Sequence, residues 1–199
     1  MARRKVEVRR EEILAATEAE VTRRGFARTR VGDVAEALGV SSALIFYHFG
    51  TKEKLFAEAL GHAVERDLAR LDSAVAKASD PVDAVRRILS LYSPQGESSG
   101  WTIWVDAWAE SMREPEMRAM SRSLDLRWKD VLAEQIKLGN DQGVFSCEDP
   151  DDAAWRLSAL LDGLAVQVMV HRNLTKKQLR QLVHRATAAE LGLAPDAFA

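Results

Sequence analysis

The strongest constraint on the fold is a dense run of helix signals between Val31 and Phe56, in the stretch VGDVAEALGVSSALIFYHFGTKEKLF. One buried helix face is indicated by apolar residues at i, i+3, i+4 and i+7, which are Val31, Val34, Ala35 and Leu38. Gly39 can adopt the left-handed conformation that ends a helix, and Ser41 can cap the next helix by accepting a backbone N–H. The pattern predicts two short helices joined by a tight turn, a helix-turn-helix.

The second short helix is expected to expose a face of small and polar side chains. Leu44 and Ile45 face inward on a helical projection, while Ser42, Ala43 and Tyr47 come round to the opposite face near the helix start. Side chains of this kind can reach base edges in a DNA major groove. The pattern therefore predicts base contacts from these three residues.

Two adjoining segments are similar to the signature of the TetR family of one-component repressors. They are GFARTRVGDVAEALGV and GVSSALIFYHFGTKEKLF, which together cover about the first quarter of the chain. The remainder resembles the family only in length and helical character. The resemblance implies a three-helix DNA-binding domain over residues 1–51, a helical ligand-binding and dimerisation domain over residues 52–199, and double-stranded operator DNA as a partner. It further implies that DNA is held by Thr29, Arg30, Ser41, His48 and Lys52, with phosphate contacts from all but Ser41.

Two positions depart from the family pattern. Phe46 stands where the family usually places a tyrosine that donates its hydroxyl to a phosphate, and Gly32 stands where some members place a base-contacting arginine. Tyr47 keeps a hydroxyl but points about 100° away from Phe46 on an α-helix. Sequence choice is therefore expected to depend mainly on Ser42, Ala43 and Tyr47.

Positive charge is concentrated in the segment that carries these motifs. Residues 1–52 hold ten Lys or Arg and seven Asp or Glu, a net charge of +3, whereas residues 53–199 hold eighteen and twenty-three, a net charge of −5. Attraction to DNA phosphates requires such local charge. Five basic residues near the start suggest either an arm that follows the DNA or a solvated terminus: Arg3, Arg4, Lys5, Arg9 and Arg10.

Helix start and stop signals continue along the whole chain and predict an all-α protein with about nine helices. Asp80-Pro81 and Asp149-Pro150 are strong start signals, because a capping carboxylate precedes a proline at the first helical position. The Gly, Pro and Ser content of residues 93–100 predicts a polar loop. Besides the helix-turn-helix, helices are expected over residues 8–24, 52–78, 81–91, 151–172 and 175–191, with one ending before Glu114 and one continuing to Leu138.

The last two helices are interpreted as a dimerisation unit. Apolar side chains occupy nearly the whole circumference of residues 157–170, so this helix needs cover on two sides. Pairing with a symmetry mate would give a four-helix bundle, and a purely intrachain core is the alternative. The expected interface residues are Leu157, Leu161, Leu164, Val168, Leu179, Leu182, Val183 and Ala186.

Aromatic residues and one carboxylate are the candidates for an effector site. Trp101, Trp104, Trp108 and Met112 share one helix face in WTIWVDAWAESM, and this face is either plain core or a wall that attracts an apolar or cationic ligand. Tyr92, Trp128 and Trp155 could complete such a pocket. Asp162 lies among apolar residues, so it either bonds a neighbouring helix end or supplies the negative charge for a cationic ligand.

Catalysis, a cofactor and a metal site are not indicated. His62, His171 and His184 lack partners at metal-binding spacing, and Cys147 is interpreted as an inert loop thiol. No apolar run approaches a membrane span, and a cytoplasmic protein is expected. The sequence thus predicts a DNA-binding regulator, a homodimeric repressor released by a small-molecule effector. An activator or dual regulator on the same scaffold, and a helical ligand-binding or interaction protein that does not bind DNA, are the alternatives.

Overall fold

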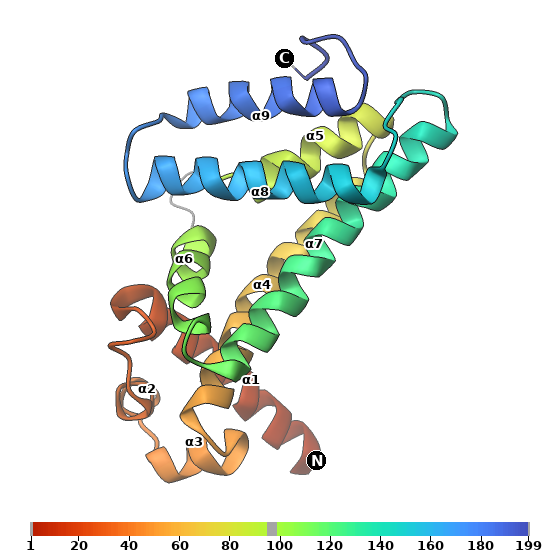
Figure 1. Ribbon diagram of the computed structural model, residues 1–199. Coiled ribbons are helices and arrows are strands. Elements are labelled where there is room, and N and C mark those ends of the chain that lie inside the picture. Colours follow the sequence, from red (N-terminus) through yellow and green to blue (C-terminus); the bar gives the residue numbers. More distant parts are fainter. Residues whose placement is uncertain (1, 95–98, 199) are drawn as a thin grey trace. The chain divides into compact units, whose positions relative to one another are not determined.

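The computed structural model describes residues 2–94 and 99–198, with side chains for 9–94 and 100–198. Within these ranges the chain forms nine helices and no strand (Figure 1), which confirms the predicted all-α class. The helices are α1 (Ala2–Arg24), α2 (Val31–Leu38), α3 (Ser42–Phe49), α4 (Lys52–Ala76), α5 (Pro81–Tyr92), α6 (Ser99–Ser111), α7 (Pro115–Asp141), α8 (Pro150–Met169) and α9 (Lys176–Glu190).

The chain divides into two compact units. The first unit comprises Met1–Arg66 and Ser98–Leu124, and the second comprises Asp67–Glu97 and Asp125–Ala199. The boundaries fall inside α4 and inside α7, so each of these helices continues from one unit into the other. The division differs from the predicted one at residue 51, because α6 and the starts of α4 and α7 belong to the first unit.

Local backbone chemistry produces the helix-turn-helix as predicted. α2 ends at Gly39, whose φ of 64° is the left-handed conformation that glycine adopts without a steric penalty. The Ser41 hydroxyl then accepts a hydrogen bond from the backbone N–H of Leu44 at 3.3 Å and caps α3. The predicted bounds of α2 and the start of α3 are confirmed. The helices enclose a core that includes Ile13, Val21, Phe26, Val34, Ile45, Phe49 and Phe56.

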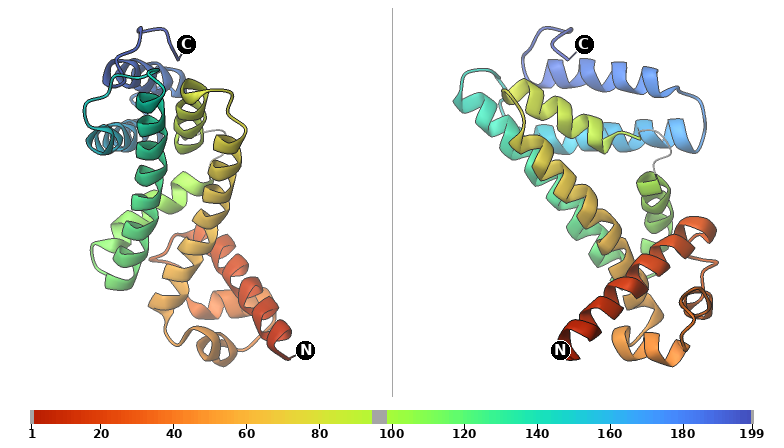
Figure 2. Two further views of the ribbon diagram at one scale, coloured as in Figure 1. Left: turned by 90° about the vertical axis from the view of Figure 1, so that its right-hand side faces the viewer. Right: turned by 180° about the vertical axis from the view of Figure 1, so that it is seen from behind.

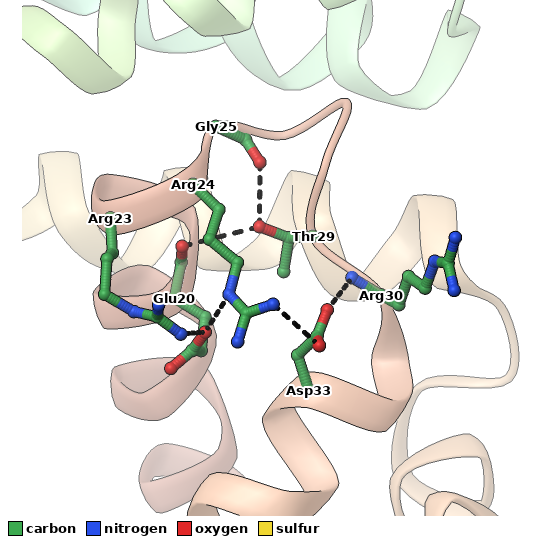
Figure 3. A network of polar contacts seen from close by, with 7 residues as sticks. All are labelled: Glu20, Arg23, Arg24, Gly25, Thr29, Arg30 and Asp33. Atoms are coloured by element: carbon green, nitrogen blue, oxygen red, sulfur yellow. Dashed lines mark hydrogen bonds and ion pairs between the residues drawn. The ribbon is translucent and has the colours of Figure 1, made fainter.

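An arginine bridges the first two helices (Figure 3). The Arg24 guanidinium lies 2.8 Å from a Glu20 carboxylate oxygen on α1 and 2.9 Å from Asp33 Oδ1 on α2. Asp33 Oδ2 also accepts the backbone N–H of Arg30 at 2.8 Å, which satisfies a donor at the start of α2. Exposed ion pairs contribute little stability individually, but the shared carboxylate fixes the direction in which α2 leaves α1.

A carboxylate on α6 holds the end of α1. Asp106 Oδ2 accepts the backbone N–H of Phe26 at 2.5 Å, and α6 packs against α1. The neighbouring Gly25 has a φ of +83°, and a Cβ atom there would lie 3.1 Å from Asp106 Oδ2. Both the backbone conformation and the close carboxylate therefore favour glycine at this position. This contact explains why α6 belongs to the first unit.

The second unit contains α5, α8, α9 and the later parts of α4 and α7. α8 and α9 run side by side in opposite directions (Figure 2). The predicted start signals are confirmed, because the Asp80 carboxylate accepts the N–H of Asp83 at 2.8 Å and the Asp149 carboxylate accepts the N–H of Asp152 at 3.0 Å.

Several helix ends differ from the predicted ones. α1 begins at Ala2 rather than near Val8, and α8 ends at Met169, shortly before Arg172 adopts a φ of 56°. α7 continues past Gly139, which was expected to stop it. A Cβ atom at Gly139 would lie 2.0 Å from the Phe145 ring, so this glycine allows close packing rather than ending the helix. Of the predicted polar loop at 93–100, residues 95–98 lie outside the described residues.

We expect Asp106→Ala to lower the free energy of unfolding by about 1.5–3 kcal/mol, because a buried backbone N–H loses a charged acceptor. Asp106→Asn, which keeps an acceptor oxygen, should lose less. Chemical denaturation followed by circular dichroism measures the effect. Glu110→Ala, which removes the same charge from the same helix, is the control. Equal stability of Asp106→Ala and the unmodified protein would contradict the assigned role of this contact.

Candidate nucleic-acid interface and effector site

The exposed face of α3 is the surface predicted to contact base edges. Tyr47 is 80% exposed and Ala43 is exposed, while Ser42 is half-buried and Ile45 lies in the core. The Tyr47 ring stands edge-on to the His48 ring, with the centroids 5.5 Å apart. The structure therefore presents a tyrosine hydroxyl beside small residues, a surface that can enter a major groove and donate or accept a hydrogen bond.

Thr29 does not fit its predicted phosphate contact. Its side chain is 0% exposed, and its hydroxyl donates to the carbonyl oxygen of Gly25 at 2.7 Å. The side chain secures the turn after α1 instead (Figure 3). Arg30 is exposed, and its guanidinium points away from the network around Glu20 and Asp33 in the same view.

Lys52 lies where an anion is favoured, whereas His48 is half-buried in the last turn of α3. Lys52 is the first residue of α4, where free backbone N–H groups and the helix dipole attract negative charge. Its ammonium lies 4.9 Å from the centroid of the Phe56 ring, which holds the side chain near the helix start. Ser41 remains exposed, although its hydroxyl already caps α3.

Two of the five basic residues near the start of the chain, Arg9 and Arg10, form ion pairs within the first unit. Arg10 pairs with Glu58 and lies 4.6 Å from the centroid of the Phe49 ring, and Arg9 pairs with Glu12 at 2.6 Å. The side chains of Arg3, Arg4 and Lys5 lie outside the described residues. The intrachain partners of Arg10 are unforeseen, because Glu58 is far from it in sequence.

The tryptophans of α6 form a cluster within the first unit. The Trp108 ring centroid lies 5.8 Å from that of Trp101 and 6.2 Å from that of Trp104. Trp101 is buried and the other two are half-buried. Met112 does not extend this face, because it follows the end of α6 and is 70% exposed. Trp101 and its neighbours are thus packed against one another, with Asp106 directed to α1.

The second unit contains a half-buried carboxylate, Asp162, beside aromatic rings. The Tyr92 hydroxyl donates to Asp162 Oδ1 at 2.9 Å, and the Tyr92 ring stands edge-on to Trp128 with centroids 5.1 Å apart. Burial raises the pKa of Asp162 to about 6, although the Tyr92 hydrogen bond and the positive charge of Lys129 both act to lower it. Burial and the Asp162 charge raise the pKa of Tyr92, which stays protonated and donates.

A buried lysine near this carboxylate is the residue that the sequence reasoning missed. Lys129 is 5% exposed, pairs with Asp125 on the same helix, and places its ammonium 4.5 Å from the centroid of the Trp155 ring. Trp155 itself is 52% exposed. The Asp125 to Lys129 spacing of four residues was a visible signal, but the contact with α8 was not.

The apolar space beside this group is small. A cavity of about 10 Å³, room for about one water molecule, lies between α5, α7 and α8, and its lining includes Tyr92, Trp128 and Leu161. The side chains that line this cavity therefore pack closely, and a ligand larger than water needs some rearrangement of them.

The predicted dimer residues fall into two groups. Leu157, Leu161, Leu179 and Val183 are buried within the single chain, where they pack α8 and α9 into the second unit. They are core residues, as the intrachain alternative requires. The half-buried members, which can still offer apolar area to another subunit, are Leu164, Val168, Leu182 and Ala186.

The described part of the chain gives little support for a metal site, a reactive thiol or a membrane span. No group of three or more His, Cys, Asp or Glu residues there is arranged to hold a metal ion. Cys147 is buried, and burial raises the pKa of its thiol. Among the same residues, no helix combines the length and apolarity needed to cross a membrane.

Comparison with known proteins identifies the family. Residues 13–59 match the model for bacterial regulatory proteins of the tetR family, and residues 81–192 match the model for the C-terminal domain of BetI-type transcriptional repressors. The HTH-type transcriptional regulator BetI of Stenotrophomonas maltophilia is 31% identical over 166 residues, covering 79% of each chain. BetI of Cronobacter sakazakii is 26% identical over 197 residues, covering 92% of this chain and 95% of the relative.

A solved structure is similar across both units. It is described as a transcriptional regulator from Saccharomonospora viridis in complex with choline, with a TM-score of 0.78, 32% identity, and coverage of 89% of this chain and 94% of the other. These relatives are named as regulators of transcription rather than enzymes. The chain therefore belongs to the tetR family of bacterial transcriptional regulators and carries a BetI-type C-terminal domain.

Proposed function

We propose that the protein is a homodimeric repressor that leaves its operator when a small quaternary ammonium compound such as choline binds in the second unit. The observation that carries the choice of effector is the half-buried Asp162 carboxylate, which accepts the Tyr92 hydroxyl beside the Trp128 ring and has a raised pKa. A similar regulator has been solved in complex with choline. Because its partner is operator DNA, we place the protein in the cytoplasm.

The chemistry of this group suits a quaternary ammonium ion. Such an ion has no N–H to donate, so recognition depends on its charge and on contact with aromatic faces. Trp128 and Trp155 supply aromatic surface, and Asp162 supplies the opposite charge. A bound cation offsets the unfavourable burial of the ionised carboxylate, which gives the site a preference for positive ligands.

The DNA contacts are assigned to α3 and the positions around it. Ser42, Ala43 and Tyr47 contact base edges, whereas Arg30, His48 and Lys52 contact phosphates. Phosphate contacts orient the protein on the duplex, and base contacts specify the sequence. Two copies of α3 in a dimer contact two half-sites of one operator, which raises affinity without new contacts.

Release requires the effector to bind more tightly to the conformation that does not bind DNA. α4 begins with the phosphate-binding Lys52 and continues into the second unit, so we propose that its tilt carries the signal. A change in this tilt alters the spacing of the two α3 helices in the dimer.

Lys52→Ala should weaken binding to all DNA sequences and reduce the slope of log affinity against log salt concentration by about one, because one phosphate contact is lost. Fluorescence anisotropy with a labelled duplex from upstream of the protein's own gene, at several salt concentrations, measures the slope. Lys54→Ala, at an exposed position on the same helix, controls for net charge. An unchanged slope in Lys52→Ala alone would count against this contact.

Choline affinity should depend on the protonation of Asp162. The cation favours the ionised carboxylate, so affinity should be constant well above the pKa of about 6 and fall about tenfold for each pH unit below it. Asp162→Asn, which can still accept the Tyr92 hydrogen bond, should bind weakly at every pH. Calorimetric titration between about pH 5 and pH 8 tests this, with Asp130→Asn as an exposed control on α7. A pH-independent affinity in the unmodified protein would contradict the assignment.

Leu182→Glu should convert the dimer to a monomer, because a carboxylate replaces half-buried apolar area on α9. Operator affinity should fall with it. Sedimentation velocity measures the mass, and Gln181→Glu, on an exposed neighbouring position, is the control. A dimer that survives Leu182→Glu would show that α9 does not form the interface as proposed.

A further inference from the structure

Lys129 is the one charged side chain that is buried among those the structure describes. Burial of an ammonium group is expensive unless opposite charge and polarisable surface replace the lost water. Arginine and lysine elsewhere on α7, such as Lys137 with its side chain 49% exposed, keep their charge at the surface. The position of Lys129 therefore needs an explanation beyond helix stability.

The partners of this ammonium are the kinds of group that would recognise a cationic ligand. It pairs with the Asp125 carboxylate and lies 4.5 Å from the centroid of the Trp155 indole. Its positive charge also lowers the pKa of Asp162, which favours the ionised carboxylate. Asp162 lies seven residues after Trp155 and therefore on the same face of α8. Aromatic face and carboxylate are thus both engaged by a side chain of the protein itself.

We infer that the Lys129 ammonium occupies the place of the effector's cationic group in the ligand-free protein. This ammonium must leave the Trp155 face before a cationic ligand can bind there. The inference rests on the proposed function, because it concerns the same group of residues. Two cations cannot share this face without strong repulsion, since each would lose part of its countercharge. Lys129 has a flexible four-carbon stem, which allows the ammonium to withdraw while its helix stays in place.

The inference gives Lys129 a specificity role. In the ligand-free state it neutralises charge around Asp162 and supports the closely packed arrangement, and it lowers the apparent affinity for any occupant. Only a ligand that replaces both its charge and its aromatic contact recovers the lost interactions. An alternative role, in which Lys129 binds an anionic group of the ligand or orients Asp162 for it, predicts the opposite effect of its removal.

The test compares choline binding by calorimetry to the unmodified protein, Lys129→Met and Lys129→Arg. Methionine keeps much of the buried stem without its charge, and we expect choline affinity to rise about tenfold, the scale of one cation–π contact. Arginine keeps a cation that pairs with carboxylates and stacks on indole, so affinity should not rise. Lys137→Met, on the exposed side of the same helix, should bind as the unmodified protein does.

A second ligand separates displacement from charge repulsion. The neutral isostere of choline, in which a tert-butyl group replaces the trimethylammonium group, must also displace Lys129 but is not repelled by it. Its affinity should rise in Lys129→Met as well. An affinity that rises in Lys129→Met for choline but not for the neutral isostere would overturn the inference that Lys129 occupies the site. Lys129→Gln repeats the comparison should methionine disturb folding, which circular dichroism checks.

The remaining outcomes distinguish this inference from the proposed function. If the unmodified protein binds choline, and Lys129→Met and Lys129→Gln bind it equally or more weakly, the inference is overturned and the proposed effector class stays intact. Binding by the lysine-free variants alone would support it most strongly. Failure of every variant to bind choline would overturn the effector class and the inference together.

Discussion

Partial burial of the Asp162 carboxylate is the constraint on which the chemistry of the second unit depends. Its pKa is raised to about 6 because surrounding side chains remove water that would stabilise its charge. The Tyr92 hydroxyl of α5 and the Lys129 ammonium of α7 both lower the pKa of Asp162 and so partly offset this loss of hydration. In the proposed effector site, a cationic ligand would offset the cost of the ionised carboxylate, because its charge would replace part of the lost hydration.

In the first unit, hydrogen bonds fix the direction of the helices that carry the DNA-binding surface. Arg24 joins Glu20 to Asp33, and Asp106 holds the backbone of Phe26 after α1 ends. These contacts place α2 and then α3, because the short turn at Gly39 leaves little freedom between them. Ordering the surface before DNA arrives lowers the conformational entropy that binding would otherwise have to offset.

The elements that could be predicted from the sequence are those that depend on neighbouring residues. The Gly39 turn, the Ser41 cap and the Asp-Pro helix starts involve residues within a few positions of one another. The Asp106 to Phe26 bond joins residues 80 positions apart, and nothing in the spacing of either segment indicated it. The burial of Thr29, which leaves its hydroxyl bonded to Gly25, depends on how α1 packs and could not be read from its position in the motif. Helical projection grouped the tryptophans of α6, but it could not foresee that Lys129 of α7 would meet Trp155 of α8.

In the proposed function, effector and operator binding are coupled through one protein, and thermodynamic linkage makes this coupling measurable in both directions. Operator affinity should be measured with and without saturating choline, and choline affinity with and without operator. The account predicts that each ligand weakens the other by the same factor, on the scale of about 5 to 150 that such coupling usually reaches. An operator affinity that choline leaves unchanged, while choline still binds, would contradict the account.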